Sequence, residues 1–366
     1  MTNNIQIERV DLGLRSYDII IGNQILDNLT YTIKKINSYS KFFIITDENV
    51  AHFHLNKLIA EIEKSGVKFH VITLKPGEKT KDFSNLHNLC EEILAHGVDR
   101  KSLIIAFGGG VIGDLSGFVA SIVLRGIDFI QIPTTLLAAV DSSVGGKTAI
   151  NSVYGKNLIG SFYQPKLVFC DLQFLETLPK REFLSGYGEV IKYGLIKDRQ
   201  FFDYLENNWQ KILAKDIEAL KTIIAKSCKI KAEIVSLDEK ENNLRAILNF
   251  GHTFGHVFEA ETNYSDEIMH GEAVAIGMVL AAKMSVELNL LETNKLARIE
   301  NHLKNVGLII SHKNIRQNWD IKHLISHLYK DKKVENGNLT FILLNEIGSP
   351  LIKKDINESL FIKVIS

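Results

Sequence analysis

The sequence predicts an α/β N-terminal domain with a mostly parallel sheet, followed by a mostly α-helical C-terminal domain. In the first half, short apolar runs rich in β-branched and aromatic residues alternate with stretches of helical periodicity, which predicts strands covered by helices. Gly66, Gly97 and Gly126 stand where the helices are expected to end. Beyond Leu178-Pro179 the apolar residues recur at helical spacing until about Tyr329. We therefore expect two domains, residues 1–178 and 179–366.

The individual elements follow from the same patterns. The strands expected in the first domain are Tyr17–Ile21, Phe42–Thr46, Phe69–Leu74, Leu103–Phe107, Phe129–Ile132 and Leu167–Cys170. Helices are expected between several of them, as at Phe83–His96 and Leu115–Leu124. The helices expected in the second domain are Glu182–Leu195, Phe201–Leu213, Ile217–Ser236, Leu244–Glu261, Glu272–Leu290 and Lys295–Asn305. One late strand is expected at Leu339–Leu344, after the turn Asn336-Gly337.

Composition excludes several classes of protein. The 43 basic and 43 acidic residues give no net charge, which argues against a general binder of nucleic acids or membrane surfaces. No apolar run approaches the ~20 residues of a membrane span, and the N-terminus shows no signal-peptide pattern. Three widely spaced cysteines fit no metal or redox motif, so we expect reduced thiols. These features predict a cytoplasmic protein without nucleic-acid or membrane partners.

A glycine-rich turn follows one of the predicted strands. Leu103–Phe107 runs into Gly108-Gly109-Gly110-Val111-Ile112-Gly113-Asp114, a GxGxxG pattern between a strand and a helix. Glycines let backbone N–H groups approach a pyrophosphate, and a helix N-terminus adds partial positive charge. A tight strand-to-helix turn explains the same residues, and about a hundred residues precede a motif that usually opens the first βαβ unit. Asp47, after another predicted strand, suits either a ribose hydroxyl or a helix N-cap.

Four polar residues recur at helical spacing in the second domain. Arg245, Asn249, His252 and His256 are four, three and four residues apart, so on a helix over Leu244–Glu261 they share one face. A solvated helix face would also tolerate these residues, but their apolar neighbours indicate that this helix is buried. A polar stripe on a buried helix predicts a lined cavity.

Two further motifs supply metal-ligand chemistry. His270-Gly271-Glu272 precedes an apolar helix, and Glu189 stands three residues before Lys192. Two histidines and one carboxylate, here His252, His270 and Glu189, with an open position form a catalytic zinc-type site. The alternative for Glu189 and Lys192 is a surface ion pair. His323 and His327 are also four residues apart, but no comparable carboxylate-bearing motif accompanies them, so we interpret them as ordinary residues.

The segment Asp141–Asn151 contains Gly145-Gly146-Lys147-Thr148, which is similar to the end of a P-loop. The full GxxxxGK[ST] pattern fails, because its first glycine would replace Asp141, and this disfavours ATP chemistry. Lysines in glycine-rich loops nevertheless suit phosphate binding. A flexible surface loop is the alternative. The basic run Lys330-Asp331-Lys332-Lys333 is either a solvated segment or part of the same anion pocket.

Taken together, these motifs resemble the 3-dehydroquinate synthase family along essentially the whole chain. The matching stretches are Pro76–Lys81, Gly108–Asp114, Pro133–Thr135, Asp141–Asn151, Gly188–Gly194, Leu248–His256, His270–Glu272 and Asp331–Lys333. The resemblance implies an NAD-binding N-terminal domain, a metal-binding C-terminal domain and a homodimer. It also implies a divalent metal, zinc with cobalt as the alternative, held by Glu189, His252 and His270.

The resemblance further implies roles for individual residues. The implied dinucleotide contacts are Asp47, Glu78, Lys81, Gly110, Val111, Ile112, Gly113, Asp114, Thr134, Thr135, Lys147, Lys156, Phe174, Leu175, Glu176 and Thr177. The implied substrate-pocket and catalytic positions are Asp141, Lys147, Lys156, Asn157, Lys192, Lys231, Arg245, Asn249, His256 and Lys333. Arg125 matches an arginine that reaches the neighbouring subunit's site. Gly188 departs from the family, which commonly has alanine there.

The reaction implied by the resemblance converts 3-deoxy-D-arabino-heptulosonate 7-phosphate into 3-dehydroquinate and phosphate. It proceeds by transient oxidation by NAD, phosphate elimination, reduction and intramolecular aldol closure, as a step of the shikimate pathway to aromatic amino acids. The alternatives are another sugar phosphate cyclase, a metal-dependent alcohol or glycerol dehydrogenase, and a catalytically inactive NAD-binding protein.

Overall fold

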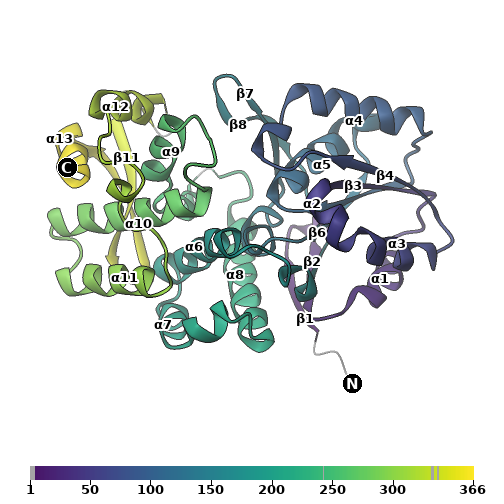
Figure 1. The fold of residues 1–366 in the computed structure, drawn as a ribbon, viewed down its shortest axis with the longest axis horizontal. Helices are drawn as coiled ribbons and strands as arrows, with labels where there is room; N and C mark the ends of the chain where they lie inside the picture. Colours follow the sequence, from purple (N-terminus) through teal and green to yellow (C-terminus); the bar gives the residue numbers. More distant parts are fainter. Residues whose placement is uncertain (1–4, 242, 331–333, 336–337) are drawn as a thin grey trace. The chain divides into compact units, whose positions relative to one another are not determined.

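The computed structural model describes residues 5–366, apart from 242, 331–333 and 336–337 (Figure 1). It divides into two compact units, unit 1 with Met1–Pro179 and Leu220–Ser236, and unit 2 with Lys180–Ala219 and Leu237–Ser366. The division at Pro179 lies one residue from the predicted boundary. The prediction of a second domain continuous over 179–366 was wrong, because most of the long helix α8 (Ile217–Leu237) belongs to unit 1. Within the described residues, no helix combines the length and hydropathy that a membrane span requires.

Unit 1 is built on a seven-stranded sheet. In spatial order its strands are β1 (Gln6–Val10), β2 (Tyr17–Gly22), β9 (Leu167–Asp171), β6 (Asp128–Pro133), β5 (Ser102–Gly108), β3 (Lys41–Asp47) and β4 (Lys68–Leu74). All neighbours pair in parallel except β1, which is antiparallel to β2. The six predicted strands of this domain are thus confirmed, and the mostly parallel sheet with them. Within this seven-stranded sheet, the edge strand β1 was the one strand missed.

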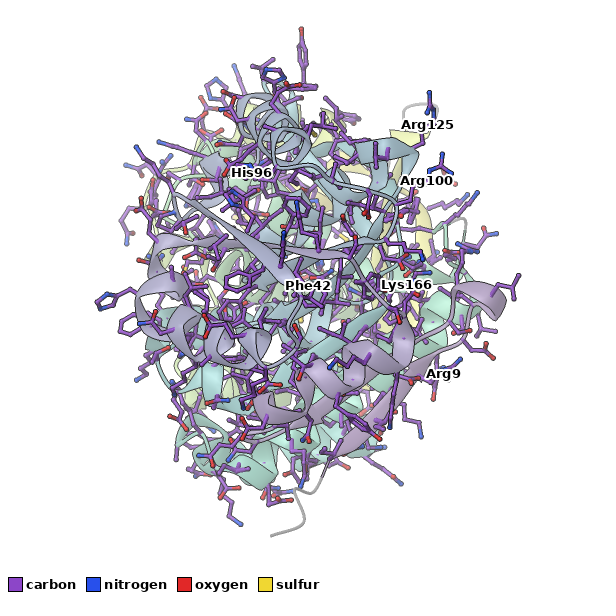
Figure 2. All side chains as sticks on the ribbon, turned by 90° about the vertical axis from the view of Figure 1, so that its right-hand side faces the viewer. Arg9, Phe42, His96, Arg100, Arg125 and Lys166 are labelled. Carbon is purple, nitrogen blue, oxygen red and sulfur yellow. The ribbon has the colours of Figure 1, made fainter. Side chains whose placement is uncertain are left out.

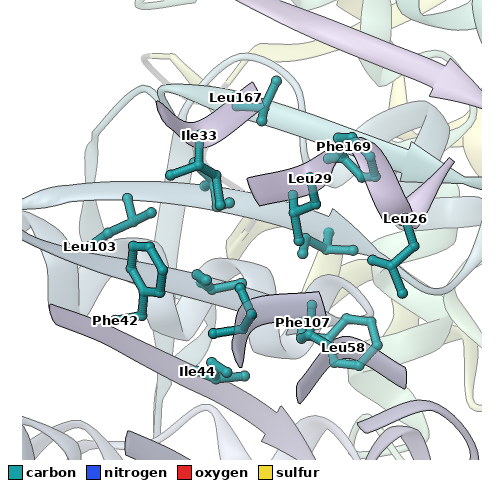
Figure 3. Close-up of a cluster of buried hydrophobic side chains, with 14 of the residues drawn as sticks. Leu26, Leu29, Ile33, Phe42, Ile44, Leu58, Leu103, Phe107, Leu167 and Phe169 are labelled. Carbon is teal, nitrogen blue, oxygen red and sulfur yellow. The ribbon is translucent and has the colours of Figure 1, made fainter. Parts of the chain in front are cut away.

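Helices cover both faces of this sheet. Its helices of eight or more residues are α1 (Leu29–Ile36), α3 (Asn56–Glu63), α4 (Phe83–Ala95), α5 (Gly110–Ile122) and α8. Successive residues of β3 point to opposite faces. Phe42 and Ile44 pack with Leu29 and Leu58, from α1 and α3, in the cluster of Figure 3. Phe43 and Ile45 pack with residues of α4 and α5 on the other face.

The neighbouring strands β3 and β5 are connected to their next strands in opposite directions across the sheet. After β3 the chain passes through α3 on one face to β4, whereas after β5 it passes through α5 on the other face to β6. In open α/β sheets, ligands bind at the carboxyl ends of strands at such a switch point. Here those ends are Asp47 and Gly108.

A separate hairpin formed by β7 (Lys147–Ser152) and β8 (Gly155–Phe162) lies in the region interpreted as a glycine-rich loop. The strands were not predicted because their pattern is interrupted by glycine, asparagine and lysine. The loop alternative for this segment is therefore wrong, and Lys147 and Lys156 stand on an antiparallel hairpin.

Unit 2 is mostly helical, as predicted. Its helices are α6 (Lys180–Ile196), α7 (Arg199–Leu213), α9 (His252–Glu261), α10 (His270–Glu287), α11 (Thr293–Asn305), α12 (Ile321–Lys330) and α13 (Glu358–Ile365). A small antiparallel sheet contains β10 (Val334–Glu335), β11 (Asn338–Glu346) and β12 (Ser349–Ile356). The predicted late strand corresponds to β11. Helix α10 is buried almost continuously over Ala273–Ala282, which makes it the centre of the unit.

The predicted helix over Leu244–Glu261 is wrong. Leu244–Asn249 forms a 3₁₀ segment, and α9 begins only at His252, after Gly251 at φ 81°. A Cβ on Gly251 would lie 2.7 Å from Met278 Cγ and 2.8 Å from the backbone of α10. The chain thus breaks because it must turn left-handed against α10, which only glycine allows. Arg245 and Asn249 therefore do not share a helix face with His252 and His256.

Candidate active site

Three helices of unit 2 bring Glu189, His252 and His270 together. Glu189 stands in the middle of α6, whereas the two histidines begin α9 and α10. Glu189 Oε1 lies 3.6 Å from His252 Nε2 and 3.4 Å from His270 Nε2. The ligating atoms of all three residues lie within 4.8 Å of one another, the only such trio among the described residues. The geometry therefore offers two imidazole nitrogens and a carboxylate to one ion.

Second partners orient both imidazoles. His252 Nδ1 lies 3.3 Å from the carbonyl oxygen of Phe250, and His270 Nδ1 lies 3.3 Å from both carboxylate oxygens of Glu259. A proton on each Nδ1 directs Nε2 towards Glu189, as in metal sites whose histidines are fixed by an outer partner. Sequence reasoning missed Glu259. Its position seven residues after His252, on the same side of α9, was the available signal.

The charge of this centre favours a cation. Burial lowers the pKa of His270, but Glu259 and Glu189 outweigh it and raise the pKa to about 10. Glu189 is fully buried, and its Oε2 pairs with the buried ammonium of Lys192. The surface ion pair considered for these two residues is therefore wrong. Two buried carboxylates around one imidazole provide the negative charge that a divalent ion requires.

Close helix packing holds the ligands in place. A Cβ on Gly271 would lie 1.9 Å from the carbonyl oxygen of Ser185, and one on Gly188 would lie 2.9 Å from the carbonyl oxygen of Gly271. Arg181 adds a bidentate bond to Glu272, with both nitrogen–oxygen distances 2.8 Å. Glycine at 188 thus suits the short distance between α6 and α10.

The remaining candidates of unit 2 are His256, Arg245, Asn249 and Lys333. The ring centroid of His256 is 5.4 Å from that of His252 and 6.4 Å from that of His270. Arg245 is 1% exposed and donates to the carbonyl oxygen of Glu239. Asn249 donates to Glu241 Oε1 at 2.7 Å. Lys333 lies outside the described residues.

In unit 1 the glycine-rich turn opens α5 at the switch point. A Cβ on Gly109 or Gly110 would lie 3.0 Å from Thr135 Cγ2 or Ser142 Oγ, and one on Gly113 only 2.5 Å from Gln131 Oε1. The helix is longer than the predicted Leu115–Leu124, because it starts at Gly110 and includes Val111 and Ile112. Its N-terminal N–H groups lie at the end of β5, where an anion would be stabilised.

A partly buried polar network around the buried Lys81 joins residues that are far apart in the sequence. Lys81 Nζ lies 2.7 Å from Asp114 Oδ2 and 2.6 Å from Asn157 Oδ1, while Asn151 donates to Glu78 Oε1 at 2.7 Å. Burial opposes the charge on Lys81, but Asp114 and Glu78 outweigh it and raise its pKa. Four predicted site residues are thereby held in one cluster.

Asp47 caps a short helix, α2 (Glu48–Val50), and its Oδ1 accepts from the backbone N–H groups of Asn49 and Val50. The N-cap alternative is therefore correct, and since both bonds use Oδ1, a ribose role through Oδ2 is compatible with it. Asp141 pairs with Lys231 from α8, at 2.8 Å. These contacts belong to unit 1.

The other predicted contacts of unit 1 differ in exposure. Thr134 and Phe174-Leu175 are buried, whereas Lys147, Asn157 and Glu176-Thr177 are exposed. Arg125 is exposed as well, and its side chain points outward (Figure 2).

His54 was missed by sequence reasoning. Its Nε2 lies 2.7 Å from Thr177 Oγ1, and its ring lies edge-on to Phe174 at 5.1 Å. His54 lies within Ala51–Leu55, a π-helical turn, which is a feature often found at functional sites. No sequence motif marks this residue.

Comparison with known proteins identifies the family. The model of the 3-dehydroquinate synthase N-terminal domain matches residues 71–185, and that of the C-terminal domain matches residues 186–334. The 3-dehydroquinate synthase of Rhodospirillum rubrum is 47% identical over 348 residues, covering 94% of this chain and 90% of that protein. The chain belongs to the 3-dehydroquinate synthase family. The corresponding enzyme of Mesorhizobium japonicum is 50% identical over 352 residues, covering 96% and 93%. The predicted resemblance to this family is confirmed.

Solved structures of related enzymes share the fold. A 2-deoxy-scyllo-inosose synthase complexed with carbaglucose-6-phosphate, NAD⁺ and Co²⁺ has a TM-score of 0.89 at 28% identity, covering 98% of this chain and 99% of that chain. The 2-epi-5-epi-valiolone synthase of Streptomyces hygroscopicus, with NAD⁺ and Zn²⁺ bound, has a TM-score of 0.87 at 26% identity, covering 95% of both chains. A probable glycerol dehydrogenase from Sinorhizobium meliloti, at 14% identity and TM-score 0.65, shares the fold alone and covers 94% of both chains.

Proposed function

We propose that the chain is a 3-dehydroquinate synthase that closes 3-deoxy-D-arabino-heptulosonate 7-phosphate to 3-dehydroquinate with release of phosphate. The observation that carries the proposal is the convergence of two imidazole nitrogens and the Glu189 carboxylate within 4.8 Å, in a chain 47–50% identical to curated members of this family. This trio fits zinc, with cobalt as the alternative, because both accept nitrogen and carboxylate ligands.

The cofactor assignment is NAD, and the residues at the switch point fit it. Gly109, Gly110 and Gly113 let Thr135, Ser142 and Gln131 pack closely against the turn that opens α5, and Asp47 ends the neighbouring strand. The N-terminal N–H groups of α5 suit the negative charge of a pyrophosphate. When bound, NAD supplies reversible hydride acceptance and the metal supplies Lewis-acid polarisation of a substrate oxygen.

The protein's own residues then bind the substrate and move its protons. Arg245 suits the substrate carboxylate, because its planar fork binds anions in a bidentate manner. Lys147, Lys156 and Asn157 hold the phosphate in this proposal. His256, beside the metal ligands, positions or transfers protons.

Lys192, by neutralising one oxygen of Glu189, limits the negative charge of the centre. Lys231 fixes the orientation of Asp141, which the family resemblance assigns to the neighbourhood of the nicotinamide. Asn249 is a further substrate-binding residue in this proposal.

The proposal extends to a homodimer in the cytoplasm. Exposed Arg125 is available to a second subunit, and Cys90, Cys170 and Cys228 form no disulfide, which agrees with a reducing compartment. Mixing inactive Arg125→Ala and His252→Ala chains tests the dimer. If Arg125 acts in trans, mixed dimers regain activity; if it acts within its own chain, the mixture stays inactive.

Phosphate release and NADH absorbance, followed together with the heptulosonate phosphate, NAD and zinc, test the reaction. Stoichiometric phosphate without lasting NADH supports the proposal. NADH without phosphate assigns a dehydrogenase, the activity of more distant fold relatives such as the glycerol dehydrogenase. No signal in either assay, followed by turnover of another phosphorylated sugar, assigns a different sugar phosphate cyclase.

A further inference from the structure

A second group of metal-ligating side chains lies at the far end of α9. This helix begins with His252 and ends with Glu261. Glu261 Oε2 lies 3.0 Å from His327 Nε2, and Glu261 Oε1 lies 3.7 Å from His323 Nδ1. The sequence interpretation set these two histidines aside because no comparable carboxylate-bearing motif accompanies them. In the fold, a carboxylate reaches them from a different helix.

The register of α12 presents both imidazoles to Glu261. Leu324 and Leu328 are 0% and 1% exposed, so the apolar face of α12 is fixed against unit 2. His323 and His327 each precede one of these leucines, and they stand one helical turn apart on the adjoining face. Asp320, which accepts the N–H groups of Lys322 and His323, places its Oδ2 3.9 Å from His323 Nε2.

The surroundings permit a cation to enter. The side chain of Glu261 is 14% exposed and that of His327 is 23% exposed, so both are largely desolvated, whereas His323 is 67% exposed and accessible from solvent. The positive charge of Arg316 acts on Glu261, but its guanidinium is held by Glu267 through two bonds of 2.5 Å. This bidentate pairing directs the guanidinium towards Glu267.

We propose that His323, His327 and Glu261 form a second site for a divalent transition-metal ion such as Zn²⁺ or Ni²⁺. Two imidazoles one helical turn apart with one carboxylate are a donor set that these ions accept. Unlike the trio around Glu189, this group requires the exposed His323 ring to turn before all three donors converge. The ion therefore binds less tightly than at the interior centre. Once bound, it links α12 to the end of α9.

Zinc stoichiometry of the full chain tests this proposal. Chelator-treated protein is dialysed against buffered Zn²⁺, and the ions per chain are counted. We expect the wild type to hold two ions, the His323→Ala/His327→Ala variant to hold one, and Glu261→Gln to hold one. The matched control is His87→Ala, which removes an exposed histidine of α4 and retains two ions. Equal numbers of ions in the wild type and the double variant overturn the proposal.

Thermal unfolding gives an independent measurement. An ion that binds the folded chain raises Tm, so added Ni²⁺ is expected to raise Tm of the wild type and of His87→Ala more than that of the double variant. An equal rise in all three proteins contradicts the site. Phosphate release from the heptulosonate phosphate is expected to be unchanged in the double variant, because none of these three residues belongs to the proposed active site. The second site therefore stands or fails independently of the proposed reaction.

Discussion

The two candidate cofactor regions of this chain are built in different ways. At the switch point of unit 1, the turn after β5 is made from glycines and backbone N–H groups of one continuous segment, and polar side chains support it from neighbouring elements. In unit 2, the metal centre consists of three side chains from three helices, with Glu259 and Phe250 fixing the imidazoles. A site made from backbone spreads its binding over many groups, whereas a site made from three ligands depends on each. Single substitutions are therefore expected to have larger effects in unit 2.

The largest effect is expected at a metal ligand. His252→Ala removes one of the three donors, and the lost Lewis-acid stabilisation of several kcal/mol corresponds to at least ~10³-fold lower activity. Metal content, measured after dialysis, is expected to fall with it. Full retention of the metal in this variant would remove His252 from the ligand set.

Glu259→Gln tests whether the contact of Glu259 with His270 orients this metal ligand. The amide keeps the shape of the side chain but loses the charge that holds His270, so metal affinity is expected to fall ~10–100-fold. Competition with a chelator of known affinity measures this change. The matched control is Glu300→Gln, which breaks a surface pair with Lys283 of 3.4 Å. Equal affinities in the two variants would show that Glu259 does not orient the ligand.

The sequence predicts features that depend on neighbouring residues better than features that depend on distant parts of the chain. Six strands of the unit 1 sheet and the glycine turn produce local periodicity and short motifs, so the sequence predicted them. The break at Gly251 was not predictable, because it results from the approach of α10, which is distant in the sequence. Glu259, Glu261 and His54 were missed for a related reason: each acquires its partner only through folding. The assignment of α8 to unit 1 likewise depends on tertiary contacts that periodicity does not encode.

The stability of the folded chain is expected to depend on pH through His302, which packs against the helix that carries Glu189. His302 is 2% exposed and packs edge-on against Tyr187 of α6. Burial, with a smaller contribution from Arg298, lowers the pKa of its imidazole from 6.5 to about 4. Between pH 6.5 and 4, the His302 imidazole is protonated in the unfolded chain but stays neutral in the folded chain. The free energy of unfolding therefore decreases as pH falls from 6.5 towards 4. The free energy of unfolding should be about 2 kcal/mol lower at pH 5 than at pH 7 through this residue alone.

Denaturant unfolding of the wild type and His302→Gln at both pH values measures that contribution. The glutamine does not titrate, so the pH-dependent difference should shrink in the variant, whereas His87→Gln on the surface should leave it unchanged. An identical pH dependence in wild type and His302→Gln would mean that other groups control acid stability.

The smallest effect is expected at Asp47, where the backbone-built site relies least on one side chain. Asn caps helices as well as Asp does, so Asp47→Asn retains the bonds to the N–H groups of Asn49 and Val50 and changes only the charge. If the carboxylate also accepts a ribose hydroxyl, weakening that bond by about 1 kcal/mol lowers NAD affinity roughly five-fold. Titration of the metal-loaded protein with NAD measures it, and Tm shows whether the cap is intact. Unchanged NAD affinity at unchanged Tm would leave Asp47 with capping as its only role, and would show that the turn after β5 holds the dinucleotide without it.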